Sequence, residues 1–136
     1  NGMTQSKKTS PYYKDWVATS SKDLSAMRAA IKKKDFQKLG EISEFNCLKM
    51  HAMAMATNPG LIYWNGTTVE GIHLIRELRG EGTEVYFTID ASQQLKAICQ
   101  PSDEHIVKER LGQLSGVQRV ISSKPGGPAH LIGENE

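Results

Sequence analysis

The sequence predicts an α+β domain in which an antiparallel sheet packs against helices on one of its faces. Two observations carry this prediction. Apolar residues recur at three- and four-residue offsets through the first half of the chain, as they do in helices. Residues 85–99 instead contain two short runs rich in β-branched and aromatic residues, separated by a turn, as in a hairpin. The length of 136 residues suits a single domain spanning residues 1–136.

Two long helices are expected in the first 55 residues. The first follows Ser10-Pro11, because proline is favoured at the first helical position, and it ends at the three lysines of residues 32–34. Asp35 can then cap the second helix, which extends to Met55 with apolar residues on more than one side. The apolar stripe of the first helix consists of Trp16, Val17, Leu24, Met27 and Ile31.

A shorter third helix and the hairpin come next. Thr67 and Glu70 have the spacing of a capping box, so this helix is expected to begin there and to stop at Gly80. Residues 85–89 (Val-Tyr-Phe-Thr-Ile) give the clearest strand pattern in the chain. Residues 95–99 alternate in polarity as the antiparallel partner of that strand would.

The remaining sequence favours one more helix and two more strands. A helical pattern follows Pro101-Ser102, and Gly116 closes it. The apolar run at residues 117–121 is typical of a strand. A loop rich in proline and glycine then leads to a last predicted strand at residues 129–132, so the sheet is expected to have four strands.

Composition excludes several classes of protein. Seventeen basic and fifteen acidic side chains give a net charge of only +2, which does not suggest a nucleic-acid-binding surface. No apolar stretch is long enough to span a membrane, and residues 1–10 do not resemble a secretory signal. Cys47 and Cys99 lie far apart, without metal-binding spacing, and are expected to be reduced and buried. These features together predict a cytoplasmic protein.

Spacing alone indicates little chemistry. The sequence has no glycine-rich phosphate loop before a helix and no nucleophile elbow, and its four histidines do not pair with acids as metal ligands do. We therefore predict no metal site. His51 lies within an apolar helical pattern, which favours a hydrogen-bonded core histidine over a catalytic one.

Asp90 is the residue of greatest interest, because it directly follows the strongest strand pattern. Catalytic groups are often carried at the ends of such rigid elements. Aspartates also commonly accept backbone N–H bonds in the turns that follow strands. Judged by position alone, the second, structural reading is favoured.

Several short segments in the first 91 residues form an ordered set. They are Gly2-Met3, Thr9 to Tyr13 with Trp16, Lys34-Asp35-Phe36 with Leu39-Gly40-Glu41, Asn46 with Leu48 to Ala52, Asn58-Pro59 with Tyr63, and Tyr86-Phe87-Thr88-Ile89-Asp90-Ala91. Together these segments resemble the bacterial diphosphomevalonate decarboxylases of the GHMP kinase superfamily. They keep that family's order and approximate spacing as far as Ala91, and the resemblance beyond that residue is thin.

The resemblance implies both a fold and an activity. The fold would be the ferredoxin-like C-terminal domain of this superfamily. The activity would be ATP-dependent decarboxylation of mevalonate 5-diphosphate to isopentenyl diphosphate, a step of isoprenoid biosynthesis. Asp90 matches the family's catalytic aspartate, which orients the 3-hydroxyl group of the substrate and accepts its proton. Met3 and Ala91 match positions beside the substrate. ATP and Mg²⁺ would be the cofactors, and a homodimer stays open.

Two departures from the family keep alternatives open. Ala-Gly-Pro-Asn follows the aspartate in the family, whereas Ala91 is followed here by Ser92-Gln93-Gln94. This change leaves open a related enzyme acting on mevalonate or its monophosphate, and also a non-catalytic ligand-binding or dimerisation module. The family's nucleotide-binding domain, which would bind most of the ATP and Mg²⁺, has no counterpart in the sequence. We therefore expect the chain to be inactive alone.

Overall fold

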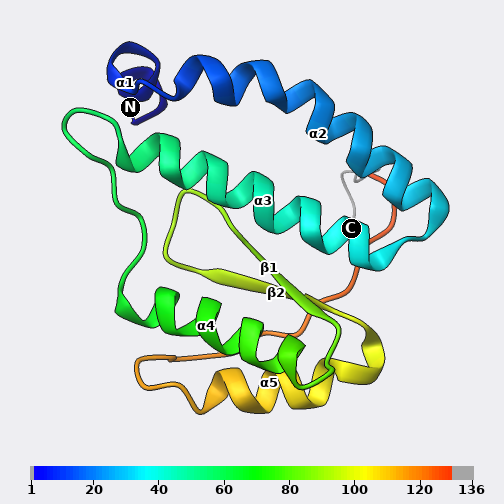
Figure 1. Cartoon of the computed structure of the whole chain (residues 1–136). Helices are drawn as coiled ribbons and strands as arrows, with labels where there is room; N and C mark the ends of the chain where they lie inside the picture. Colours follow the sequence, from blue (N-terminus) through cyan, green and yellow to red (C-terminus); the bar gives the residue numbers. More distant parts are fainter. Residues whose placement is uncertain (1, 130–136) are drawn as a thin grey trace, which may run out of the picture.

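A computed structural model describes residues 2–129 of the chain and confirms the predicted α+β class. Its sheet is a two-stranded antiparallel hairpin, with α3 and α2 on one side and α4 and α5 on the other (Figure 1). The elements are α1 (Gly2–Thr9), α2 (Tyr13–Lys33), α3 (Phe36–Met55), α4 (Gly66–Gly80), β1 (Val85–Ile89), β2 (Leu95–Cys99), the 3-10 helix η1 (Pro101–Asp103) and α5 (Glu104–Gly112).

The N-terminal residues form a short helix, α1, that the sequence did not predict. A turn at Pro11 and Tyr12 separates it from α2, so the long helix begins at Tyr13 rather than directly at Pro11. Helix α1 is fixed by hydroxyl groups: Ser6, which is buried, shares a hydrogen bond of 2.9 Å with Thr57. The sequence of α1 is polar and has no apolar periodicity, so this helix could not be predicted from the pattern of apolar residues.

Helices α2 and α3 pack side by side along their length (Figure 1). The turn between them lies where the sequence predicts it, and the Asp35 cap is confirmed: the Asp35 carboxylate accepts a hydrogen bond of 2.9 Å from Lys38 N–H. Lys34 closes the turn in a left-handed conformation. Only part of the predicted α2 stripe meets α3, because Val17, Leu24 and Ile31 are 49–58% exposed. These three residues recur every seven positions and lie beside the buried stripe rather than within it.

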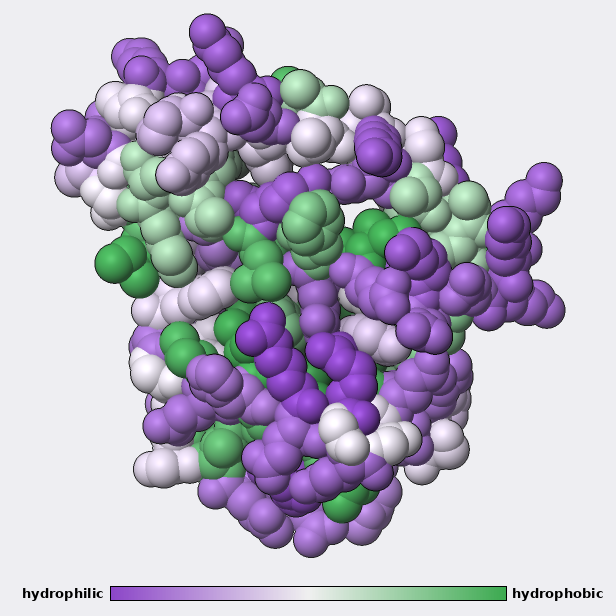
Figure 2. All heavy atoms as spheres, in the orientation of Figure 1, coloured by the Kyte–Doolittle hydropathy of each residue, from purple (hydrophilic) through white to green (hydrophobic). Residues whose placement is uncertain are grey.

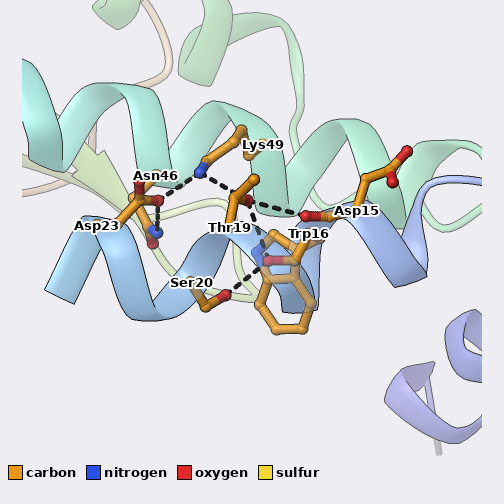
Figure 3. A network of polar contacts seen from close by, with 7 residues as sticks. All are labelled: Asp15, Trp16, Thr19, Ser20, Asp23, Asn46 and Lys49. Carbon is orange, nitrogen blue, oxygen red and sulfur yellow. Dashed lines mark hydrogen bonds and ion pairs between the residues drawn. The ribbon is translucent and has the colours of Figure 1, made fainter.

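A polar network joins α2 and α3 halfway along their contact (Figure 3). The ammonium group of Lys49 forms an ion pair with Asp23 and donates a hydrogen bond of 3.1 Å to the Thr19 hydroxyl. Asn46 Nδ2 donates to the same Asp23 carboxylate at 2.9 Å. The Asp23 and Lys49 side chains are only 15% and 20% exposed, so the pair is largely shielded from water. It fixes the register of the two helices.

Helix α4 begins one residue after Asn65, so the predicted Thr67–Glu70 capping box is wrong. Asn65 is the cap: its side chain accepts a hydrogen bond of 2.9 Å from Thr68 N–H, and the Thr68 hydroxyl accepts one of 3.3 Å from Asn65 N–H. Asparagine is as good a cap as threonine, and Thr68 takes the role usually given to glutamate. The predicted end at Gly80 is confirmed.

The hairpin supplies the centre of the core. Strands β1 and β2 pair antiparallel, as the sequence predicts, and their register places Val85 opposite Cys99 and Ile89 opposite Leu95. One face of β1 packs on α4 and α5, while Tyr86, on the other face, packs on α3 at Gly40. The main core cluster comprises Cys47, Ile72, Leu74, Ile75, Leu78, Val85, Phe87, Ile89, Val107 and Leu111.

The C-terminal residues depart from the prediction. Residues 117–121 form no strand and follow α5 as an extended segment, although Val120 still packs against the core. The predicted last strand at residues 129–132 lies outside the described residues except for Ala129, which is exposed and not in a strand. An apolar run at residues 117–121 was therefore not sufficient for strand pairing in this structure.

The surface facing the reader in Figure 2 is hydrophilic near the outer helices, with apolar atoms gathered across its middle. Cys47 is buried as predicted, whereas Cys99 is only partly covered. Within residues 2–129, no helix has both the length and the apolar character needed to cross a membrane.

Candidate active site

The outer edge of β1 is bonded to helix side chains instead of to a third strand. Glu44 of α3 accepts a hydrogen bond of 3.1 Å from Phe87 N–H. Arg79 of α4 donates to the Val85 carbonyl at 3.0 Å and pairs with both carboxylate oxygens of Glu44, at 2.7 and 3.1 Å. These bonds satisfy backbone groups that an edge strand usually leaves open, so β1 is held rigidly between two helices.

The last carbonyl of β1, that of Ile89, is also bonded to α3. His51 Nε2 lies 3.1 Å from this oxygen, and the Cys47 thiol donates to it at 3.5 Å. Since a carbonyl only accepts hydrogen bonds, Nε2 must carry the proton. Glu44, Cys47 and His51 are spaced by three and four residues, so one face of α3 follows β1 along its outer edge as far as Asp90.

His51 is the most enclosed polar group near this strand end, with 1% of its surface exposed. Its ring lies 4.7 Å from that of Trp64 and 5.9 Å from that of Tyr63, measured between centroids. Burial lowers the pKa of His51, although the bond to the Ile89 carbonyl acts in the opposite direction. The imidazole is therefore neutral at pH 7. Its burial and its hydrogen bond confirm the prediction that His51 is a hydrogen-bonded core residue.

Asp90 itself projects into solvent from the end of β1. Its side chain is 77% exposed, and its Oδ2 accepts a hydrogen bond of 2.6 Å from the Lys96 ammonium group on β2. Oδ1 has no hydrogen bond within the described residues. The carboxylate also accepts no backbone N–H bond in the following turn, which removes the structural reading that position alone favoured. The arrangement leaves one oxygen available to an external donor.

The turn after Asp90 closes without a left-handed residue, although it lacks the family's Gly-Pro pair. Ser92 N–H donates to the Asp90 carbonyl at 2.7 Å, and the Ser92 hydroxyl accepts from Gln94 N–H at 3.3 Å. The turn is also tied to the start of α4, because the Thr68 hydroxyl donates to the Gln93 carbonyl at 2.9 Å. Ala91 lies exposed at the beginning of this turn.

Helix α1 carries Met3, which is 44% exposed. The neighbouring Gly2 packs so closely on Tyr63 that a Cβ atom there would lie 3.0 Å from the Tyr63 hydroxyl oxygen. Tyr63 in turn contacts His51, whose bond to Ile89 ends directly before Asp90. A row of contacts from Gly2 through Tyr63 and His51 to the Ile89 carbonyl thus connects α1, which carries Met3, with the end of β1, which precedes Asp90.

The contact of Lys96 with Asp90 was not predicted from the sequence. Its position follows from the register, in which Lys96 faces Thr88 and so lies diagonally across from Asp90. The role of His51 at the strand end was also missed, because it depends on how α3 packs. Residues 2–129 contain no group of three or more His, Cys, Asp or Glu side chains that could hold a metal ion.

Comparison with known proteins identifies a family for this chain. The family model described as the mevalonate 5-diphosphate decarboxylase C-terminal domain matches residues 1–95. A phosphomevalonate decarboxylase from Haloferax volcanii is 30% identical over 116 residues, which cover 83% of this chain and 35% of that protein.

Solved structures of mevalonate diphosphate decarboxylases share the fold. The enzyme from Enterococcus faecalis is 35% identical, with a TM-score of 0.79, over 85% of this chain and 36% of that one. A structure described as MDDEF in complex with MVAPP, AMPPCP and magnesium has the same identity and coverage, with a TM-score of 0.80. The chain spans about a third of the length of these relatives. It belongs to the C-terminal domain family of the mevalonate 5-diphosphate decarboxylases.

Proposed function

We propose that this chain supplies the catalytic carboxylate, Asp90, for ATP-dependent decarboxylation of mevalonate 5-diphosphate or of its monophosphate. The observation that carries the proposal is the position of Asp90. Its carboxylate is exposed at the end of a strand that helices hold on its outer edge, and one of its oxygens is not bonded within the described residues. The ordered match to the family over residues 1–95 supports the same assignment.

The proposed chemistry begins at the tertiary 3-hydroxyl group of the substrate. Oδ1 of Asp90 accepts the hydroxyl proton while the hydroxyl oxygen attacks the terminal phosphorus of ATP, and ADP leaves. Phosphate then departs from C3, the carboxylate of the substrate is lost as CO₂, and its bonding electrons form the double bond. Lys96 holds Oδ2 meanwhile, so the carboxylate keeps its orientation. Met3 and Ala91 would border the carbon chain of the substrate.

We place ATP and Mg²⁺ mainly outside this chain, on a nucleotide-binding domain that completes the enzyme. The described residues offer no group of three or more His, Cys, Asp or Glu side chains that could hold Mg²⁺. The related MDDEF complex contains MVAPP, AMPPCP and magnesium together. A homodimer stays a prediction.

The phosphorylation state of the substrate is the finer question. The solved relatives are diphosphate decarboxylases, whereas the Haloferax volcanii relative is a phosphomevalonate decarboxylase. The turn at Ser92-Gln93-Gln94 differs from the family pattern. It is fixed to α4 through Thr68 and Asn65, so it lines the site with a defined shape. This turn is where the two substrates would be distinguished.

The test is ATP-dependent release of ¹⁴CO₂ from carboxyl-labelled mevalonate 5-diphosphate and 5-phosphate. It uses the complete enzyme, meaning this chain joined to a nucleotide-binding domain, either its own or that of the Enterococcus faecalis relative. We expect release from one of the two substrates and none from the chain alone. Release of ¹⁴CO₂ by the chain alone would refute the proposal that a separate nucleotide-binding domain is required for activity. No release from either substrate, by a folded complete enzyme, would favour a non-catalytic module.

A further inference from the structure

His51 is almost fully enclosed, with 1% of its surface exposed, yet its ring makes one hydrogen bond of good geometry among residues 2–129. Its Nε2–H donates to the Ile89 carbonyl, yet Nδ1 is buried without a partner in the described part of the chain. Buried polar atoms generally find partners, and an unpaired one costs stability. An apolar ring of similar size would fill the same space without that cost. The histidine is therefore explained by what its single bond holds.

That bond holds the peptide next to Asp90. The Ile89 carbonyl belongs to the peptide unit whose nitrogen is that of Asp90, so its direction fixes where the Asp90 side chain leaves the strand. Beyond this point β1 ends, and the pairing with β2 stops at Ile89 and Leu95. Within the described residues, no ladder bond to the Asp90 backbone is found beyond this pair, so the peptide is held from the side of α3, by the His51 imidazole at 3.1 Å and by the longer bond of 3.5 Å from the Cys47 thiol. Lys96 holds only the far carboxylate oxygen, Oδ2.

The ring of His51 is itself held in place. Trp64 and Tyr63 pack against it, and Tyr63 is covered by the close approach of Gly2 from α1. The direction of the Nε2–H bond is thus set by aromatic packing rather than by a second hydrogen bond. Any shift of α1 or of residues 61–64 would reach Asp90 through this ring.

We infer that His51 is a positioning residue, which orients the Asp90 carboxylate through the Ile89 carbonyl. The inference rests on the proposed function, because it concerns the geometry of the same carboxylate. A proton acceptor must lie within hydrogen-bond reach of its donor, and a displacement of about 1 Å can lower a rate by about 100-fold. His51 does not touch the substrate; it determines where Asp90 meets it.

The kinetic test compares three variants of the complete enzyme. His51→Phe fills the space but removes the donor, whereas His51→Gln can keep an N–H group near the position of Nε2. Val107→Ala, a buried residue of α5 in the core cluster on the side of the hairpin opposite α3, is the control for loss of core packing. We expect His51→Phe to lower kcat by about 10-fold or more with KM within about threefold, because positioning acts on the chemical step. His51→Gln should recover most of kcat, and Val107→Ala should keep it.

A spectroscopic test needs no variant and uses the 136-residue chain. Nitrogen-15 and carbon-13 NMR should show a neutral imidazole protonated at Nε2 and a hydrogen-bond coupling from Nε2 to the Ile89 carbonyl carbon. The absence of that coupling, or a proton on Nδ1 instead, would overturn the inference. This measurement also decides the matter if His51→Phe does not fold.

The positioning role of His51 and the proposed function of Asp90 are contradicted by different results. Wild-type kcat in His51→Phe, or an equal loss in His51→Gln and His51→Phe, would overturn the positioning role. So would a parallel loss of kcat in Val107→Ala. If Asp90→Asn retains full turnover, the proposed function fails and the orienting role fails with it. In that case the NMR coupling still shows whether His51 holds the strand end, so the two failures can be told apart.

Discussion

Replacing Glu44 with alanine tests whether helix side chains really hold the strand that carries the site. Glu44 is 12% exposed and accepts three hydrogen bonds, one from Phe87 N–H and two from the Arg79 guanidinium group. In Glu44→Ala the N–H group of Phe87, which is fully buried, loses its partner. Arg79, whose pKa Glu44 raises, loses its carboxylate as well.

The expected loss of stability can be worked from these contacts. An unpaired buried N–H group costs about 1–3 kcal/mol. Breaking a fully buried ion pair costs about 3–5 kcal/mol, but Arg79 is 31% exposed and can reach water, so we take about 1–2 kcal/mol for this part. Together they predict a loss of about 2–5 kcal/mol for Glu44→Ala. Glu44→Gln keeps an acceptor for Phe87 and should lose about half as much.

Urea unfolding of the 136-residue chain, followed by circular dichroism, measures these changes as shifts of the midpoint. Glu41→Ala is the matched control, because it removes a carboxylate of the same helix whose ion pair with Lys38 is exposed. We expect that control to change stability by less than about 0.5 kcal/mol. If Glu44→Ala matches the control, or if glutamine costs as much as alanine, then β1 is not held by these bonds.

Two further predictions concern the packing of α3. Gly40→Ala should destabilise the chain by about 1–3 kcal/mol, because the new Cβ would lie 2.1 Å from the Tyr86 ring, whereas Gly80→Ala, which meets no neighbour, should be neutral or stabilising in the same assay. Burial raises the pKa of Asp23, but hydrogen bonds from Lys49 and Asn46 outweigh it and leave that pKa below the ordinary value of 3.8. The pair therefore stabilises the fold above about pH 4 and is lost as the pH falls further, so Asp23→Asn should flatten the acid limb of a stability–pH profile; an unchanged acid limb would contradict this.

Sequence patterns predicted the helices and strands of this fold wherever apolar residues recur with one clear period, helical or extended. The α3 helix, its Asp35 cap and the register of the hairpin follow from residues close in sequence. Helix α1 was missed because its contacts, such as Ser6 with Thr57, lie 51 residues apart. Residues 117–121 have a strand pattern without a strand, because a local apolar pattern does not specify a pairing partner, and along the outer edge of β1 helix side chains take the place of one.

The sequence predicted some features of the candidate site and missed others, because the missed features depend on contacts between residues far apart in the chain. Asp90 could be named because it follows a recognisable strand and matches a family segment, but whether its carboxylate turns inward or outward depends on Lys96 across the hairpin. Spacing classed His51 correctly as a core residue. Its bond to Ile89 spans 38 residues, and no local pattern contains that information. The substrate contacts of Met3 and Ala91 remain predictions.

The most direct test of the account is the kcat of Asp90→Asn in the complete enzyme. Asparagine keeps the size of the side chain and, with Lys96 beside it, an acceptor oxygen, but it cannot take the hydroxyl proton. The loss of a positioned base usually costs about 100-fold or more, so kcat should fall at least that far, while the KM for the substrate stays within about threefold. Turnover within about tenfold of the wild-type enzyme would contradict the assignment of Asp90 as the catalytic carboxylate.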